Sequence, residues 1–350
     1  MSHSISALTA WLTSYALIGL GAAQMGTAHA ADFPLYAITK TITLGSPEKW
    51  DFVNYDDVSH RVFVAHETEV TVVDGRSGDI VGHVDVAGAN GVAVIPALGK
   101  GYAGSRAKKA GIVFDLNTFK ILKEVPADSD TDGVIYDPAS KRVFIIQGDP
   151  HNITAIDPAT DTAVATVALD GKPEFATADG AGKLYVAITD KSEVARVDTK
   201  SAKEDAAWPV ADCVRPHGMA MDRKTRRLFM SCANNTMAII DADNGRVVTT
   251  AAIGKGTDSA AFDTRRKLAF SSNGDGTLSI IREDGPDKFT ALGDVPTQIL
   301  ARTMAVDSDS GRVYTVTGEP AKFDPNDTAP HRHIPIQPGS VRLLFVDPAR

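Results

Sequence analysis

Short apolar runs alternate with turn residues along most of the chain. Runs rich in β-branched and aromatic residues, such as Arg61-Val-Phe-Val-Ala65 and Lys183-Leu-Tyr-Val-Ala187, predict strands of four to six residues. They lack the 3.6-residue period of amphipathic helices. Linking pieces such as Asp137-Pro-Ala-Ser-Lys141 predict turns, because an Asp side chain accepts hydrogen bonds from nearby backbone N–H groups and Pro fixes φ. The pattern therefore predicts an all-β fold.

Acidic residues recur with the strands at an interval of about 42 residues. One series closes the third strand of each unit: Asp74, Asp115, Asp157, Asp198, Asp241, Glu283 and Asp347. A second series closes the first strand: Asp56, Asp137, Asp179, Asp222, Asp263 and Asp307. We interpret both series as turn-forming residues and not as catalytic acids.

A unit of about 42 residues with four short strands is typical of a β-propeller blade. Seven units fit the sequence, at approximately 48–88, 89–128, 129–171, 172–213, 214–256, 257–298 and 299–350. The seventh lacks an outer strand, and residues 38–44 match the outer strand at 163–169. The sequence thus predicts one domain over 31–350, a seven-bladed β-propeller whose last blade is closed by the N-terminal strand.

The blades resemble the YVTN-type β-propeller repeat of exported bacterial proteins, and the resemblance covers essentially all of 31–350. Lys183-Leu-Tyr-Val-Ala187 is the nearest copy of the signature. The Asn that follows the motif in the family is replaced here by His66, Ser105, Gln147, Ile188, Cys232, Ser272 and Thr317. Such propellers are binding scaffolds, cofactor handlers and occasionally enzymes, so the resemblance implies a fold and export but no single function.

The first 30 residues have the features of a signal peptide. They contain no Asp, Glu, Lys or Arg and end in Ala28-His29-Ala30, which fits signal-peptidase cleavage before Ala31. The n-region departs from the usual pattern because it has His3 but no Lys or Arg. We expect a periplasmic or secreted protein without an integral membrane segment after cleavage.

One polar residue stands near the start of each predicted innermost strand. These are Asp51, Asn90, Asp132, Glu174, His217, Asp258 and Arg302. We expect them to ring the mouth of the central channel, where convergent polar groups form a ligand site. The alternative is a solvated channel rim without a specific ligand.

Five histidines map to the same face as this ring. His217 belongs to it, His66 and His151 lie in predicted loops between second and third strands, and His331 and His333 lie in the 318–339 insertion. Imidazoles near carboxylates can hold Zn or Cu, whereas the spacing Asp128, Asp130, Asp132 suggests Ca²⁺ without the Glu that completes an EF-hand loop. The metal candidates are therefore Asp128, Asp130, Asp132, Glu174 and His217, with scattered surface histidines and a solvated acidic loop as alternatives.

The two cysteines, Cys213 and Cys232, are expected to form a disulfide in an oxidising compartment. The predicted register places Cys232 opposite His217, and Cys213 precedes His217 by four residues. A thiolate pair that binds metal together with His217 is the alternative.

Composition narrows the possible functions. The chain has 350 residues and a formal net charge of -8, which argues against a nucleic-acid partner. No C-x-x-C-H, G-x-S-x-G, Walker or dinucleotide motif is present, and no catalytic residue can be assigned. These features favour a non-enzymatic protein that binds a small molecule or an extracytoplasmic protein at the channel mouth.

Two alternatives remain open. One is a divalent-metal-dependent hydrolase or lactonase, with the metal held by ring carboxylates and His217 as the general base. The other handles a tetrapyrrole or quinone cofactor, with His66 or His331 as a ligand.

Overall fold

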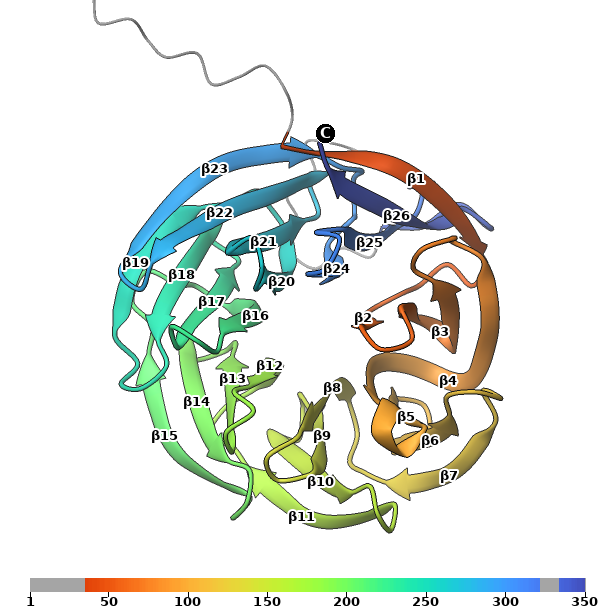
Figure 1. Ribbon diagram of the computed structural model, residues 1–350. Helices are drawn as coiled ribbons and strands as arrows, with labels where there is room; N and C mark the ends of the chain where they lie inside the picture. Colours follow the sequence, from red (N-terminus) through yellow and green to blue (C-terminus); the bar gives the residue numbers. More distant parts are fainter. Residues whose placement is uncertain (1–34, 322–333, 350) are drawn as a thin grey trace, which may run out of the picture. The chain divides into compact units, whose positions relative to one another are not determined.

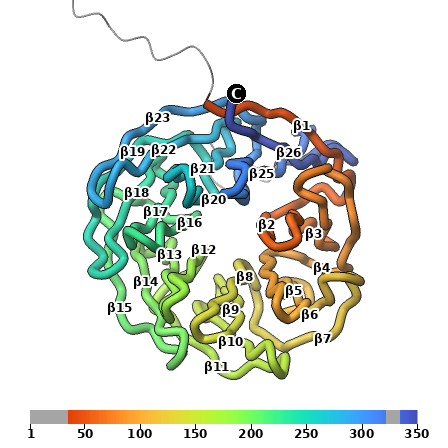
Figure 2. Tube along the Cα trace, viewed as in Figure 1, coloured from red at the N-terminus to blue at the C-terminus, as the bar shows by residue number. Residues whose placement is uncertain are grey.

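The computed structural model describes residues 35–321 and 334–349. Within these residues the strands form six sheets around a central opening (Figures 1 and 2). The predicted signal peptide lies outside the described residues. No helix in the described part of the chain is long and apolar enough to cross a membrane.

Four sheets each consist of four consecutive antiparallel strands. Their strands are β8 (Thr131–Asp137), β9 (Arg142–Gln147), β10 (Asn152–Asp157) and β11 (Thr162–Ala168); β12 (Pro173–Ala178), β13 (Lys183–Ile188), β14 (Glu193–Asp198) and β15 (Lys203–Pro209); β16 (Pro216–Asp222), β17 (Arg227–Cys232), β18 (Thr236–Asp241) and β19 (Val247–Ala252); and β20 (Thr257–Asp263), β21 (Leu268–Asn273), β22 (Thr277–Gly285) and β23 (Lys288–Pro296).

A fifth sheet joins the two ends of the described chain. It contains β24 (Thr303–Val306), β25 (Val313–Thr317), β26 (Val341–Pro348) and, on the outside, β1 (Tyr36–Gly45). β1 pairs antiparallel with β26 from Tyr36↔Pro348 to Gly45↔Val341. The N-terminal strand therefore completes the sheet that the C-terminal strands begin, as Figure 1 shows.

The sixth sheet corrects the predicted count of seven four-stranded blades. It has six strands, β2 (Val53–Asp56), β3 (Arg61–Asp74), β4 (Ile80–Ile95), β5 (Lys100–Ser105), β6 (Ala110–Asp115) and β7 (Ile121–Pro126), with the short 3₁₀ helix η1 (Pro96–Leu98) after β4. The link expected between the first two units stays extended inside β4. Ala89 pairs with Glu67 of β3 and with Ser105 of β5, so one hydrogen-bonded ladder continues through both units.

The core lies between neighbouring sheets, which explains the alternation in the sequence. The third residue of each predicted second strand is an aromatic ring, and all seven are at most 1% exposed: Phe63, Tyr102, Phe144, Tyr185, Phe229, Phe270 and Tyr314. The outer strands β7 and β11 are mostly exposed, because only one side of each meets the core. Burial thus falls from the inner strands to the rim, as expected for sheets packed face to face.

The turn acids have the predicted structural role. Asp56, Asp179 and Asp263 each accept a hydrogen bond from the backbone N–H two residues on, at 3.1, 2.8 and 2.9 Å. In the third-strand series, Asp115 and Asp157 accept the same bond at 3.0 and 2.9 Å. The prediction that these residues shape turns is confirmed for both series.

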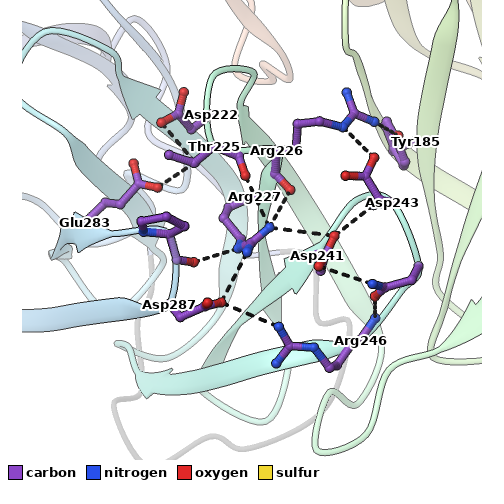
Figure 3. A network of polar contacts seen from close by, with 12 residues as sticks. Tyr185, Asp222, Thr225, Arg226, Arg227, Asp241, Asp243, Arg246, Glu283 and Asp287 are labelled. Carbon is purple, nitrogen blue, oxygen red and sulfur yellow. Dashed lines mark hydrogen bonds and ion pairs between the residues drawn. The ribbon is translucent and has the colours of Figure 1, made fainter.

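Side chains at the turns also connect one sheet to the next. The Tyr102 hydroxyl donates to Asp161 of the following sheet at 2.5 Å, and Tyr314 donates to the carbonyl of Gly75 at 2.9 Å. Arg226 donates to the hydroxyl of Tyr185 at 2.9 Å (Figure 3). The repeat's aromatic position therefore fills the core and fixes neighbouring sheets together wherever it is Tyr.

Candidate functional site

A β-bulge opens the innermost strand of five repeats, and a predicted ring residue sits in each bulge. The register shifts between Thr131 and Val134 in β8, between Pro173 and Ala176 in β12, and between Pro216 and Met219 in β16. Equivalent shifts occur in β4 and β20. They contain Asn90, Asp132, Glu174, His217 and Asp258. A bulge changes the direction of a side chain. Because the bulges occur at equivalent positions of the innermost strands, the five polar side chains lie at the same level of the channel.

A cavity of about 230 Å³ is formed at this level. Its lining includes five of the seven ring residues: Asp51, Asp132, Glu174, Asp258 and Arg302. Arg106 also lines it, although it is not one of the predicted ring residues. Four carboxylates and two guanidinium groups thus face one small pocket, which we call the channel-mouth pocket.

Two aromatic rings form the floor of the channel-mouth pocket. Phe52 and Phe175 stack across the channel with ring centroids 4.9 Å apart and planes inclined by 25°. Both rings also line a second cavity of about 570 Å³ that includes Tyr55, Tyr136 and Arg223. The pair therefore separates two chambers. The sequence pattern did not predict this pair, although each Phe directly follows a ring acid.

Glycines stand at the corresponding positions of three other repeats. Gly91, Gly133 and Gly218 each follow a ring residue. A Cβ on Gly91 would lie 2.3 Å from the carbonyl oxygen of Asp132, and one on Gly218 would lie 2.3 Å from the nitrogen of Ala260. Gly91 and Gly218 therefore allow adjacent inner strands to approach closely.

Two carboxyl groups of the channel-mouth pocket have raised pKa values. Burial raises the pKa of Asp51 to about 7, and the negative charge of Asp258 adds to the effect while Arg302 and Arg106 oppose it. Burial also raises the pKa of Asp132 well above its usual value, with the charges of Asp51 and Glu174 adding to the rise. Such perturbed acids in a cavity are typical of functional sites.

Partners inside the pocket are few. Asn90 donates to Asp132 Oδ1 at 3.0 Å, and Arg302 Nε lies 3.1 Å from Asp258 Oδ2. Arg106 is drawn away by Asp130, whose Oδ1 lies 3.2 Å from its Nε. Within the described residues, no donor or cation contacts the carboxylate of Asp51. The four carboxyl groups of the pocket thus outnumber its two guanidinium groups, and ionisation of all four would leave an excess of negative charge.

His217 lies beside two of these carboxylates. Its Nδ1 is 3.4 Å from Glu174 Oε1 and 3.7 Å from Asp258 Oδ1. Burial lowers the pKa of His217, but the attraction of Glu174 and Asp258 outweighs it and the pKa rises above 6.5. The nitrogen is buried and makes no hydrogen bond to a described residue, so the two contacts are charge attractions over a longer distance.

A disulfide fixes the segment that carries His217, as predicted. The sulfurs of Cys213 and Cys232 are 2.06 Å apart. Cys232 pairs with Pro216 and not with His217 as the predicted register had it, because the bulge between Pro216 and Met219 shifts the ladder. Both cysteines are at most 3% exposed. The bond therefore ties the entry of β16 to β17 and excludes a metal-binding thiolate pair in this structure.

Other predicted site residues lie elsewhere. Asn90 is buried and also donates to the carbonyl of Thr131, and it supports Asp132 without lining the pocket. His66 is fully buried, with its two ring nitrogens 3.1 Å from Thr71 Oγ1 and 2.5 Å from the carbonyl of Pro47. His151 lies in the turn between β9 and β10 and does not line the pocket. His331 and His333 are outside the described residues.

The calcium-like run does not converge on one point. Asp128 accepts from Ser129 N and Asn152 Nδ2, while Asp130 contacts Arg106 and Lys172. Among the described residues, only Glu174, His217 and Asp258 bring three potential metal-ligand atoms within 4.8 Å of one another. Of the predicted metal candidates, only Glu174 and His217 belong to this group, and Asp258 completes it in place of Asp128, Asp130 and Asp132.

Comparison with known proteins shows the fold and no more. No family model matches the chain, and no curated protein matches it. A chain of Kuenenia stuttgartiensis hydrazine synthase has a TM-score of 0.67 at 14% identity, covering 75% of this chain and 91% of that one. U3-55K has a TM-score of 0.72 at 10% identity, covering 88% of this chain and 98% of that one. The chain is thus similar to β-propellers, while membership of the YVTN-type repeat family stays a prediction.

Proposed function

We propose that the protein is an exported ligand-binding β-propeller whose channel-mouth pocket takes a small organic cation. The observation that carries this proposal is the convergence of Asp51, Asp132, Glu174 and Asp258 on one cavity. The A-x-A ending of residues 1–30, the resemblance to exported repeats and the disulfide support a periplasmic or secreted location.

The charge of the pocket favours a cationic ligand. A buried carboxylate with a raised pKa is unstable in its charged form, and an incoming positive charge stabilises it. Among residues 35–321 and 334–349, no cationic side chain contacts Asp51, since Arg302 pairs with Asp258. A ligand ammonium near Asp51 and Asp132 would supply a positive charge that stabilises their ionised forms. Ligand binding should therefore promote ionisation of these carboxyls, and their ionisation should strengthen binding.

The size of the pocket favours a small molecule over a protein partner. Its volume of about 230 Å³ is below the range usual for drug-sized ligands. The stacked Phe52 and Phe175 close its floor, and their apolar rings suit the methylene or methyl groups of an organic cation. The same rings limit how deep a ligand can enter.

We also infer that the ring of seven polar residues marks seven functional repeats. β4 supplies both the outer strand of one repeat and the inner strand of the next, so six sheets still present seven inner segments. The predicted seven-unit period of the sequence supports this interpretation.

The proposal is tested by thermal shift with choline, arginine and putrescine as probes. The protein is held in HEPES with EDTA, so that neither a buffer cation nor a metal competes. At least one probe should give a saturable rise in Tm that Asp51→Asn abolishes. Asp170→Asn is the matched control, because Asp170 is an exposed acid whose side chain is 91% accessible. Lack of a shift with all three probes, or an equal shift in Asp51→Asn, would overturn the proposal.

One observation favours a second candidate, the metal-dependent hydrolase. Glu174, His217 and Asp258 provide the mixed nitrogen and oxygen ligands that such an enzyme needs beside a pocket. Zinc-dependent turnover of p-nitrophenyl acetate or γ-butyrolactone, lost in Glu174→Gln, would support it. No observation favours tetrapyrrole or quinone handling, since both nitrogens of His66 are engaged.

A further inference from the structure

We propose that Glu174, His217 and Asp258 form a binding site for a divalent transition metal, with zinc as the ion that fits best. This inference deepens the proposed function, because two of the three residues line the channel-mouth pocket. The metal would occupy the side of the pocket near His217 and leave Asp51 and Asp132 for the organic ligand.

The spacing of the three side chains suits a metal ion. Zinc holds nitrogen and oxygen ligands at about 2.0–2.2 Å, so ligand atoms of a tetrahedral site lie roughly 3.3 Å apart. His217 Nδ1 lies 3.4 Å from Glu174 Oε1 and 3.7 Å from Asp258 Oδ1, and all three ligand atoms are within 4.8 Å of one another. Small side-chain shifts bring all three into contact with one ion.

The orphaned nitrogen of His217 is an independent reason to expect a ligand. Nδ1 is buried and has no hydrogen-bond partner in the described structure, which is costly for a polar atom. Its distances to the two carboxylates, 3.4 Å to Glu174 and 3.7 Å to Asp258, are longer than those of a good hydrogen bond. A metal ion would displace the imidazole proton, bind the nitrogen lone pair and neutralise charge on both carboxylates.

The scaffold holds the three ligands rigidly. They occupy the second positions of β12, β16 and β20, which are the innermost strands of three neighbouring sheets. The Cys213–Cys232 disulfide fixes the approach to His217, and Arg302 holds the second oxygen of Asp258 at 3.1 Å. Outer contacts of this kind orient metal ligands and tune their affinity.

The ligand chemistry selects the metal. One imidazole with two carboxylates suits Zn²⁺ and related transition ions, whereas Ca²⁺ and Mg²⁺ prefer oxygen ligands alone. Glu174 and Asp258 face the cavity, so a bound ion would keep an open side toward the pocket. A metal with three protein ligands and an open position is the arrangement that reacts with, or binds, a second ligand.

Calorimetric titration of the chelator-treated full chain with ZnCl₂ tests the proposal. We expect one equivalent of Zn²⁺ to bind, with affinity reduced at least about 100-fold in His217→Ala and Asp258→Asn because each loses a direct ligand. His83→Ala is the matched control: His83 Nδ1 also lies 2.7 Å from a carboxylate, Glu69, but this pair belongs to no three-residue group. Its affinity should equal that of the wild type.

A spectroscopic measurement guards against misfolded variants. Co²⁺ in the wild type should give visible absorption of a four- or five-coordinate nitrogen–oxygen site, absent in His217→Ala, while both proteins keep the same circular dichroism in EDTA. No Zn²⁺ binding by the wild type, or binding unchanged in His217→Ala, overturns the metal site. If the choline, arginine or putrescine shift in EDTA persists in that case, only the metal inference fails and the proposed function stands.

Discussion

The acids at the two ends of the inner strands differ in how many hydrogen-bond and ion-pair partners they have. At the turn end, Asp222 accepts from Lys224 N at 2.9 Å, from Thr225 Oγ1 at 3.1 Å and from Lys267 Nζ at 2.6 Å. At the channel mouth, Asp51 has no such partner in the described residues. Through Thr225, Asp222 belongs to a dense network around Arg226 and Arg227 (Figure 3).

The effect on acidity is opposite in the two regions. The pKa of Asp222 is lowered to about 2, because its hydrogen bonds outweigh the effect of burial. Burial dominates at Asp51 and raises its pKa to about 7. An acid whose ionised form is stabilised by hydrogen bonds, and whose pKa is lowered, therefore belongs to the scaffold. An acid whose pKa is raised because its ionised form lacks partners is a candidate for ligand binding. Glu283 is the exception at the turn end, because burial raises its pKa to about 7 as well.

The largest expected effect breaks the turn-end network. Asp222→Ala removes the partner of Lys267 and two turn bonds, so we expect a loss of about 3 kcal/mol in the free energy of unfolding. Asp258→Asn at the channel mouth should cost less than about 1 kcal/mol, because its ion pair with half-exposed Arg302 is weak. Urea denaturation of both variants measures the difference. Equal losses would contradict the division of the acids into scaffold and site.

The pH dependence of stability sharpens the comparison. The pKa of Asp51 is about 7 in the folded protein and near 3.9 in the unfolded chain. Between these values the folded state holds a proton that the unfolded state has lost, so stability falls as pH rises from about 4 to 7. In Asp51→Asn this pH-dependent decrease in the free energy of unfolding should be smaller by about 2 kcal/mol. One pKa unit corresponds to about 1.4 kcal/mol, and part of the Asp51 effect is shared with the neighbouring acids that titrate together with it.

Denaturation of the wild type and Asp51→Asn at pH 5 and pH 8 measures this effect. Glu283 contributes a fall of the same sign to both proteins, so the difference between them isolates Asp51. A variant that is stabilised equally at both pH values would show that Asp51 is already ionised at pH 5.

The smallest effect concerns the floor of the channel-mouth pocket. A double-mutant cycle of Phe52→Leu and Phe175→Leu should give a coupling energy of about 1 kcal/mol, the value typical of stacked aromatic pairs. Phe229 and Phe262, also stacked with centroids 4.9 Å apart, form the matched control within the core. A coupling near zero for the channel pair alone would mean that the two rings do not hold each other across the opening.

Much of the fold is legible in the sequence because its signals are local and repeated. The turn Asp residues and the strand spacing describe interactions within one unit. The buried aromatic position recurs with the same period, although its contacts also reach the neighbouring sheet. The blade count was wrong because the joint inside β4 depends on a continuous ladder through Ala89, which has no sequence signature.

The candidate site could be predicted only in part from the sequence. Ring position identified Asp51, Asp132, Glu174, His217 and Asp258, because a repeated offset maps to one level of the channel. The stacking of Phe52 on Phe175 depends on an approach across the ring between different sheets, and such contacts carry no local signal. A clue was available, since Phe follows two ring residues where Gly, Ser or Thr follows the others.

The pairing of β1 with β26 has a consequence for biosynthesis. The hydrogen bond from Thr39 to the carbonyl of Phe345 joins residues 306 positions apart. Among the described strands β1 is made first and β26 last, so β1 waits for its partner while all the others are synthesised. Until then it presents an unpaired edge, which is a hazard for aggregation. The ring therefore closes only after β26 has been made, and this step is a slow, long-range search.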